Sequence, residues 1–337
     1  MRILHVTECY DGGVSRAIDS IAKFVPEHEH LLLWEGHTRP SVGLYHKSAR
    51  LPKNPISRIF SVNRLARAAD VDLIHAHSSW AGFYSRTLRP AAPLIYQPHC
   101  FVFDDPERSN LSKAIYRAAE SLLSRHSKAI FVLTPHEKRL AQALNARPAI
   151  HLVPNVATIE VTKSQWAKSD QTEIVMAGRL AAQKDPEYFG TLARLVRQKR
   201  PEVKFTWLGD GDPSYRDYLK SCEVNVSGWL DTDSLASKLD SASIYFHSAR
   251  YEGFPLSVLD AAAADLPILV RDLECFEGFD LESVQSPQEA AAAVVALIDD
   301  RRKFMMVRSK SRRLLETMNP EAQRQAIESG YAQAVST

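Results

Sequence analysis

The stretch EIVMAGRLAAQKDPEYFG, residues 173–190, passes from a strand through a basic loop into a helix. Glu173–Ala177 is a short apolar run, and a helical pattern begins near Pro186. Short apolar runs alternate with helical patterns in this way along the whole chain. Such alternation predicts an α/β fold in which parallel sheets are flanked by helices.

The pattern falls into two halves, each of which predicts one doubly wound sheet. The expected strands are Arg2–Thr7, His30–Trp34, Leu73–His77, Leu94–Gln97 and Ala129–Thr134, then Glu173–Ala177, Lys204–Gly209, Ser243–Ser248 and Pro267–Val270. The expected helices are one starting near Val14, then Pro186–Lys199, Ser214–Cys222, Leu235–Leu239, Pro255–Ala264 and Pro287–Asp299. A polar segment around Val153–Ser169 separates the halves, so we expect domains at residues 1–155 and 156–319. A last helix opens at Asn319-Pro320, and the pattern leaves open which domain it joins.

Composition indicates an ordinary globular protein with an uneven distribution of charge. The 337 residues are 45% hydrophobic and 24% charged, and they suffice for two cores. Residues 1–155 hold 20 Lys and Arg against 13 Asp and Glu, together with 11 of the 12 histidines. This basic half suggests an anionic partner: a nucleotide phosphate, a phosphorylated acceptor or an anionic membrane.

Cysteine spacing and hydropathy favour a cytoplasmic location. The four cysteines stand far apart without a CxxC pair, which indicates neither a zinc site nor a disulfide framework. The opening MRILHVTECYDGG lacks the apolar core of a signal peptide. The apolar run Ala290–Ile298 is far shorter than the ~20 residues that a bilayer requires. We therefore expect no membrane span.

Residues 47–70 form a distinct basic segment, in which Ile59, Phe60, Val62 and Leu65 interleave with Arg58, Arg64 and Arg67. This spacing predicts a basic amphipathic helix. Two interpretations stay open: a helix that docks on an anionic membrane surface, and an ordinary solvated helix of the first domain.

Candidate ligand-binding residues follow the predicted strands of the second half. Arg179 and Lys184 come after Glu173–Ala177, and ligands of open α/β sheets bind at the carboxyl ends of the strands. Arginine as a bidentate fork and lysine as a point charge suit a diphosphate. A solvated basic loop is the alternative for this pair alone.

Three further turns add to this pair. LGDGD at 208–212 allows close backbone approach, and VSGWL at 226–230 offers a backbone edge and an indole for a base. EGFP at 252–255 places a carboxylate beside the amides of a helix N-terminus. The apolar helix that follows carries Asp260, whose charge needs a partner such as backbone amides or an arginine.

In order and spacing, AGRLAAQKDP, WLGDGD, VSGWL and YEGFPLSVLDAAAADLPILV resemble the donor half of family 4 glycosyltransferases, retaining enzymes with the GT-B fold. The first half is similar more loosely, through DGGVSRAI, DLIHAH, QPH and VPN. The resemblance covers most of residues 1–280. It implies two Rossmann-like domains facing a central cleft: an acceptor-side domain at 1–155, with helix 320–335 packing back on it, and a nucleotide-sugar donor domain at 156–319.

The resemblance also implies roles for single residues. Arg179 and Lys184 would hold the leaving diphosphate, Glu252 would contact the donor sugar, and Asp260 would accept hydrogen bonds from the ribose. His99 would lie near the transferred sugar, where it could stabilise oxocarbenium charge, whereas the neighbouring His75 and His77 would be packing or acceptor-side residues. The remaining donor-binding positions are Gly12, Gly13, Gly178, Gly209, Trp229, Leu230, Gly253, Phe254, Pro255 and Leu256.

Some positions depart from the family's pattern. Asp260 stands where glutamate is usual, and the loop RDLECFEGF at 271–279 lacks the frequent paired glycines and glutamate. No Asp-x-Asp pair stands out as a metal clamp, so we expect metal independence and no cofactor. Arg179, Lys184 and the helix N-terminus would then neutralise the diphosphate.

The resemblance therefore implies retaining transfer of a sugar, from UDP on family frequency, to a glycan or lipid-linked acceptor in bacterial cell-envelope or exopolysaccharide synthesis. We expect a cytoplasmic protein, peripheral at the inner face of the membrane, without a nucleic acid partner. Two alternatives stay open. One is a GT-B sugar-nucleotide epimerase, which needs no acceptor, and the other is a catalytically weak nucleotide-sugar-binding subunit of another transferase.

Overall fold

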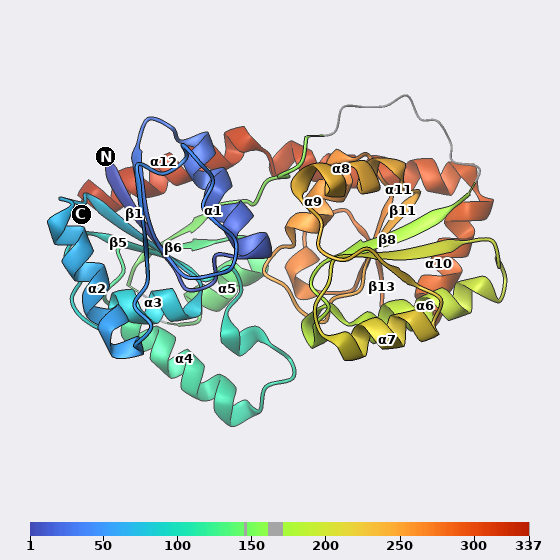
Figure 1. Ribbon diagram of the computed structural model, residues 1–337, viewed down its shortest axis with the longest axis horizontal. Helices are drawn as coiled ribbons and strands as arrows, with labels where there is room; N and C mark the ends of the chain where they lie inside the picture. The colour runs from blue at the N-terminus through green and yellow to red at the C-terminus, as the bar shows by residue number, and fades with distance from the viewer. Residues whose placement is uncertain (145–146, 161–170, 337) are drawn as a thin grey trace. The chain divides into compact units, whose positions relative to one another are not determined.

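The computed structural model describes residues 1–144, 147–160 and 171–336, so most of the polar segment expected between the halves lies outside the described residues. The chain divides into two compact units, each with its own parallel sheet (Figure 1). Unit 1 comprises Met1–Val156 and Asn319–Thr337, and unit 2 comprises Ala157–Met318. Helices flank both sheets, which confirms the predicted α/β fold.

Unit 1 contains a seven-stranded sheet in the order β3-β2-β1-β4-β5-β6-β7. Its strands are β1 (Arg2–Thr7), β2 (Glu29–Trp34), β3 (Lys47–Arg50), β4 (Leu73–His77), β5 (Leu94–Gln97), β6 (Ala129–Val132) and β7 (Ala149–Leu152). Its helices are α1 (Gly12–Phe24), α2 (Pro55–Ala68), α3 (Ser79–Arg86), η1 (Val102–Asp104), α4 (Asn110–Ser124), α5 (Pro135–Gln142) and α12 (Pro320–Ser336). The strand order reverses between β1 and β4, where open sheets of this kind bind ligands.

The basic segment 47–70 is not one helix, and this expectation needs correction. Its first residues form strand β3, which pairs with β2, and helix α2 begins only at Pro55. Pro52 disfavours a continuous helix, and the Asn54 side chain caps α2 by accepting a hydrogen bond from Ile56 N at 2.9 Å. The amphipathic helix is therefore shorter than predicted.

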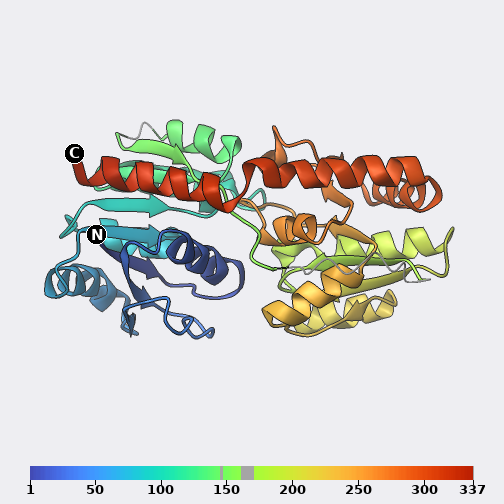
Figure 2. The same cartoon turned by 90° about the horizontal axis from the view of Figure 1, so that it is seen from above.

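Helix α12 completes the core of unit 1 from the far end of the chain. Ile327 and Tyr331 are buried against Ile3 and Phe131 of the sheet. Figure 2 shows α12, in red, lying along this sheet. Since α1 also packs against α12, these two helices cover the same face.

Unit 2 contains a six-stranded parallel sheet in the order β10-β9-β8-β11-β12-β13. Its strands are β8 (Glu173–Ala177), β9 (Lys204–Leu208), β10 (Asn225–Val226), β11 (Ile244–His247), β12 (Ile268–Arg271) and β13 (Glu282–Val284). Its helices are η2 (Ala182–Lys184), α6 (Pro186–Arg197), α7 (Pro213–Ser221), α8 (Thr232–Ser241), α9 (Leu256–Ala263), η3 (Glu274–Phe276), α10 (Pro287–Asp299) and α11 (Arg301–Thr317). The predicted elements are present here, and β10, β13, η2, η3 and α11 are additional.

Helix α9 is the apolar helix that carries Asp260, and its residues from Leu256 to Ala262 are all buried. Within the described part of the chain, no helix combines the length and the apolar composition of a membrane span.

Candidate functional site

The loops that follow β8 and β9 are held together by backbone hydrogen bonds. Leu180 N donates to Asp210 O at 2.8 Å, and Asp212 N donates to Leu180 O at 2.9 Å. Gly209 adopts φ +141°, and a Cβ there would lie 2.2 Å from Gly178 O. Only glycine fits between two backbones this close, so the glycine-rich turn is a packing requirement of this sheet edge.

The third turn, VSGWL, lies beside the second. Gly209 N donates to Ser227 Oγ at 3.1 Å, and Gly209 and Gly228 form an isolated antiparallel bridge. Trp229 is 67% exposed, so its indole face is accessible, and Leu230 follows it half-buried. The loop after β8 and the turns LGDGD and VSGWL are therefore neighbours at one edge of the unit 2 sheet.

Arg179 and Lys184 differ in their surroundings. Arg179 is exposed and has no hydrogen bond or ion pair with the residues that the structure describes. Lys184 is largely buried, and its Nζ is hydrogen-bonded to Glu252 Oε1. Its stem packs against Gly178, where a Cβ would lie 3.2 Å from Lys184 Cε. Of these two cations, Arg179 is thus available to a ligand, whereas Lys184 already forms an ion pair with Glu252.

Glu252 is partly buried and ionised, with 9% of its side chain exposed. Burial alone would raise the pKa of this carboxyl, but the Lys184 ammonium and His247 together lower it to about 2. His247 Nε2 lies 3.4 Å from Glu252 Oε1, at the end of β11. The carboxylate therefore keeps its charge at neutral pH because two cationic or polar neighbours face it.

A second charged cluster fixes the backbone next to Lys184. Asp185 has φ +52° and caps α6 by accepting from Tyr188 N at 3.1 Å. Its carboxylate also accepts from Arg250 Nε at 3.0 Å and from Arg271 Nη1 at 2.8 Å. This cluster ties the ends of β8, β11 and β12 together, and so it orients the loop that carries Lys184.

The turn Glu252–Pro255 leads into α9 and is covered by the loop after β12. Pro255 is the N-cap residue of α9, and Leu256 is its first residue. Phe254 is buried, with its ring 5.6 Å from the Phe276 ring and 5.0 Å from the Phe279 ring. The 271–279 loop, which departs from the family's pattern, therefore packs on this turn with aromatic side chains.

Asp260 has protein partners. Its Oδ1 accepts from Thr158 N at 2.7 Å and from Thr158 Oγ1 at 3.2 Å. A backbone amide therefore satisfies this buried charge, as one of the sequence interpretations allowed, although the donor lies 102 residues away in the chain.

One Asp-x-Asp spacing lies in the glycine-rich turn of this sheet edge. Asp210 and Asp212 have this spacing, but Asp210 binds Arg216 and Gly211 N, and Asp212 caps α7 by accepting from Ser214 N at 2.9 Å. Among the described residues, both carboxylates therefore contact their own loop and the start of α7.

The remaining candidate residues belong to unit 1. His99 follows β5 with φ +61°, and its Nε2 lies 3.1 Å from His77 Nδ1. Burial lowers the pKa of His99 to about 4, so the ring is neutral at neutral pH. Gly12, with φ +54°, and Gly13 open α1 directly after β1. These residues lie at the carboxyl ends of β5 and β1.

Sequence reasoning missed several residues that build the site. His247, Asp185, Arg250 and Arg271 were not singled out, although they hold Glu252 and the Lys184 loop in place. His247 could have been found by the rule that strand ends carry the site, and Asp185 by its position before Pro186. Nothing local signals the two arginines, because their partner is far away in the chain.

Comparison with known proteins agrees with this architecture. Residues 25–156 match a glycosyl transferase 4-like domain, and residues 171–300 match the glycosyl transferases group 1 domain. A UDP-Gal:alpha-D-GlcNAc-diphosphoundecaprenol alpha-1,3-galactosyltransferase of Escherichia coli is 24% identical over 75% of this chain and 72% of its own.

Two solved structures share the fold over nearly the whole chain. Sucrose-phosphate synthase from Thermosynechococcus elongatus has a TM-score of 0.82 at 15% identity, with all of both chains covered. Anabaena HepE in complex with UDP-glucose has a TM-score of 0.78 at 15% identity, covering 98% of this chain and 99% of that one. From its two domain matches, its fold and its ordered motifs, the chain belongs to the family 4 glycosyltransferases of the GT-B fold.

Proposed function

We propose that this protein is a retaining glycosyltransferase that moves a sugar from a nucleoside diphosphate sugar, with UDP as the favoured nucleotide, to a glycan or lipid-linked acceptor. The observation that carries the proposal is the single sheet edge where exposed Arg179, the Lys184–Glu252 pair and the turn into α9 come together. The E. coli relative uses UDP-galactose and a diphosphoundecaprenol-linked acceptor, as its name states, and HepE was solved with UDP-glucose. These names support a role in bacterial surface polysaccharide synthesis.

In this proposal, Arg179 supplies the bidentate contact to the diphosphate, because its guanidinium is exposed and has no partner among the described residues. Lys184 adds a second positive charge while keeping its contact with Glu252, since an ammonium group has three donors. Glu252, held as an ionised acceptor, binds hydroxyls of the donor sugar. No metal ion or cofactor is required for this arrangement.

The reaction that fits these roles is a front-face displacement. The bond between the anomeric carbon and the diphosphate oxygen breaks, and the acceptor oxygen bonds to the same face of the sugar. The acceptor's proton passes to the departing diphosphate, so no side chain acts as nucleophile. Arg179, Lys184 and the amides at the start of α9 stabilise the negative charge that develops on the leaving group.

For Asp260 we propose a shared role. The carboxylate already accepts two hydrogen bonds from Thr158 at Oδ1. In this proposal a ribose hydroxyl becomes a further donor to the same carboxylate, which is an acceptor-only group when ionised. The shorter side chain then places the ribose closer to α9 than a glutamate would.

The test is donor-dependent product formation with the purified protein. UDP-sugars are incubated with a diphosphoundecaprenol-linked saccharide, and the anomeric configuration of the product is read by NMR. Transfer with retention supports the proposal. Isomerisation of the donor without an acceptor would instead show an epimerase, and tight donor binding without turnover would show a binding subunit.

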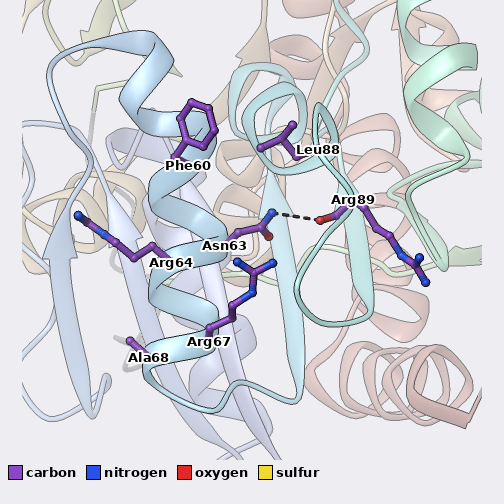
Figure 3. A pocket seen from close by; sticks show the side chains of 7 residues that line it. All are labelled: Phe60, Asn63, Arg64, Arg67, Ala68, Leu88 and Arg89. Atoms are coloured by element: carbon purple, nitrogen blue, oxygen red, sulfur yellow. Dashed lines mark hydrogen bonds between the residues drawn. The ribbon is translucent and has the colours of Figure 1, made fainter.

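We also propose that unit 1 docks on an anionic membrane surface through α2 and its neighbours. A groove of about 720 Å³ is lined by Phe60, Asn63, Arg64, Arg67, Ala68, Leu88 and Arg89 (Figure 3). Phe60 is 58% exposed and Ile56 is 67% exposed on the same helix. Exposed apolar side chains next to arginines suit an interface with anionic headgroups.

Helix α4 adds a second exposed apolar stripe, which the sequence reading missed. Leu111, Ile115 and Leu122 are 73%, 60% and 57% exposed, and their spacing places them along one side of the helix. An apolar stripe that no described residue covers is unusual, and we propose that it takes part in the same docking.

A further inference from the structure

Four histidines of unit 1 form one continuous chain of hydrogen bonds. His99 Nε2 lies 3.1 Å from His77 Nδ1, and His77 Nε2 lies 3.0 Å from His5 Nδ1. His5 Nε2 in turn lies 2.9 Å from His30 Nδ1. At the far end, His30 Nε2 lies 3.0 Å from the carbonyl oxygen of Val25. Each of the three inner imidazoles therefore uses both of its nitrogens within the protein.

The sheet topology creates this chain. His30, His5 and His77 stand on the adjacent strands β2, β1 and β4, and His99 follows the next strand, β5. Successive rings are stacked, with centroids 5.2 to 5.3 Å apart. His5 and His77 have no exposed surface, and His30 is 4% exposed. The chain thus runs across the sheet, under the face that α1 and α12 cover.

All four rings are neutral at physiological pH. Burial is the main cause that lowers the pKa of each imidazole, and it lowers the pKa of His99 to about 4. A neutral imidazole has one nitrogen that donates and one that accepts. The direction of every hydrogen bond in the chain is therefore set as soon as one of them is known.

The Val25 carbonyl sets that direction, because a carbonyl oxygen can only accept. His30 must then carry its hydrogen on Nε2, which leaves its Nδ1 to accept from His5 Nε2–H. By the same step His5 Nδ1 accepts from His77 Nε2–H, and His77 Nδ1 accepts from His99 Nε2–H. His99 Nδ1 is left without a hydrogen.

We propose that the Val25 carbonyl, acting through His30, His5 and His77, fixes His99 as the Nε2–H tautomer and keeps its Nδ1 as a hydrogen-bond acceptor. His30, His5 and His77 are then positioning residues. The catalytic meaning rests on the proposed function together with the role that the family resemblance implies for His99, which would lie near the transferred sugar. A bare nitrogen pairs with a substrate hydroxyl, and its lone pair favours positive charge that develops on the sugar.

The remaining geometry agrees with this role. His99 is half-buried, and its Nδ1 has no hydrogen bond with the residues that the structure describes. The left-handed backbone at His99, φ +61°, is a conformation that non-glycine residues seldom adopt. The row of hydrogen-bonded histidines cannot pass a proton onward at its far end, since the Val25 carbonyl does not take up a proton from His30. It therefore orients His99 and does not conduct protons.

His75 is the natural comparison. It lies close to His5 and His77 but is not part of the hydrogen-bonded row of histidines. Its Nδ1 lies 2.9 Å from Tyr331 Oη, and its Nε2 has no partner among the described residues. Nitrogens of His5, His75 and His77 lie within 4.8 Å of one another, a spacing that a metal ion could also exploit. An ion there would replace the hydrogen bond between His5 and His77, so the two arrangements are distinguishable.

The test is NMR of the full chain with ¹⁵N-labelled histidine and no substrate. Long-range ¹H–¹⁵N correlations identify which ring nitrogen carries the hydrogen, and His99→Gln assigns the His99 signals. We expect Nε2 protonated and Nδ1 bare for His99 in the wild type. A His99 that carries its hydrogen on Nδ1, an even mixture of tautomers, or metal-bound nitrogens in this cluster would overturn the inference.

Variants of His77 then test the positioning role. His77→Leu removes the acceptor, so we expect mixed tautomers at His99 and a loss in kcat of about tenfold to hundredfold, as for other orienting side chains. His77→Gln keeps a carbonyl toward His99 and an amide toward His5, so it should restore the single tautomer and most of kcat. Tyr331→Phe removes the hydroxyl next to His75 and should leave the His99 signals unchanged.

The readouts separate this inference from the proposed function. A single Nε2–H tautomer in a protein that transfers no sugar would support the inference and contradict the proposed function. Unchanged His99 signals in a folded His77→Leu variant would overturn the inference even in an active enzyme.

Discussion

At the scale of single residues, Glu252 shows how the site keeps a carboxylate ionised although little of its side chain is exposed. Its carboxylate is hydrogen-bonded to Lys184, and His247 Nε2 lies 3.4 Å away. A buried carboxylate without such neighbours would be neutral. The contacts with Lys184 and His247 therefore keep an ionised acceptor where the proposed donor sugar binds.

The pKa of Glu252 predicts a specific loss of stability in acid. Its folded-state pKa of about 2 lies below the ordinary value of 4.5, so its contribution is fully present above pH 4.5 and is lost as the pH falls toward 2. The difference corresponds to about 3 kcal/mol at 1.36 kcal/mol per unit. Glu252→Gln should be less stable at neutral pH and should lose less stability on acidification, as measured by urea unfolding from pH 6 to pH 3.

The matched control for this prediction is Glu202→Gln, which alters an exposed glutamate of the same unit. It should follow the wild-type pH dependence. If Glu252→Gln also followed the wild-type slope, the ion pair with Lys184 would not be the source of the acid sensitivity.

How much of the site could be predicted depends on the distance to each residue's partner. Arg179, Lys184 and Glu252 follow strands or precede a helix, so the rule that strand ends carry the site finds them, and the family resemblance assigns their roles. The partners of Asp185 and Asp260 lie 65 to 102 residues away. Local sequence carries no signal for such pairings, because the fold alone brings the groups together.

At the scale of elements, the interlocked loops after β8 and β9 determine the shape of the proposed diphosphate site. Gly209 and Gly178 approach so closely that a Cβ at Gly209 would overlap Gly178 O at 2.2 Å. Gly228 in the neighbouring turn also has a positive φ, +78°, but a Cβ there would meet no atom within 4 Å. An alanine at Gly209 would therefore meet both backbone strain and steric overlap, whereas an alanine at Gly228 would meet backbone strain alone.

We predict that Gly209→Ala costs more than about 3 kcal/mol of stability, since a strained backbone and overpacking add. Gly228→Ala should cost about 1 to 2 kcal/mol, from the backbone alone. Urea unfolding of both variants measures the difference. Equal costs at the two positions would show that the loops separate easily and that close approach is not required.

Element boundaries show where sequence reasoning succeeds and where it fails. Strands β1, β4, β5 and β8 have their predicted bounds, because buried parallel strands are distinct apolar runs between turns. Strand β3, with the exposed sequence KSAR, has no such run and was read as helix. The domain of α12 could not be read from its pattern, since its place depends on which core Ile327 and Tyr331 complete.

At the scale of the whole molecule, we propose that the excess of basic residues in the first half attracts the protein to an anionic membrane. We predict that the protein sediments with vesicles containing anionic lipid and not with zwitterionic vesicles. The double substitution Arg64→Glu with Arg67→Glu should weaken this binding at least tenfold, at about 1 kcal/mol for each basic residue near the surface. High salt should weaken the wild type in the same direction.

The control carries the same change of charge on unit 2, Lys199→Glu with Lys204→Glu, at two exposed positions. It should bind anionic vesicles as the wild type does. Equal loss in both double variants would mean that net charge, and not the α2 surface, governs attraction to the membrane.

The central claim is that unit 2 binds the diphosphate of a nucleotide sugar through Arg179 without a metal ion. Calorimetric titration of UDP, GDP, ADP and CMP into wild type, Arg179→Ala and Lys204→Ala, in the presence of a chelator, tests it most directly. We predict micromolar binding of one nucleoside diphosphate to the wild type and to Lys204→Ala, and its loss in Arg179→Ala. Absence of binding to the folded wild type, or unchanged binding to Arg179→Ala, would contradict the claim.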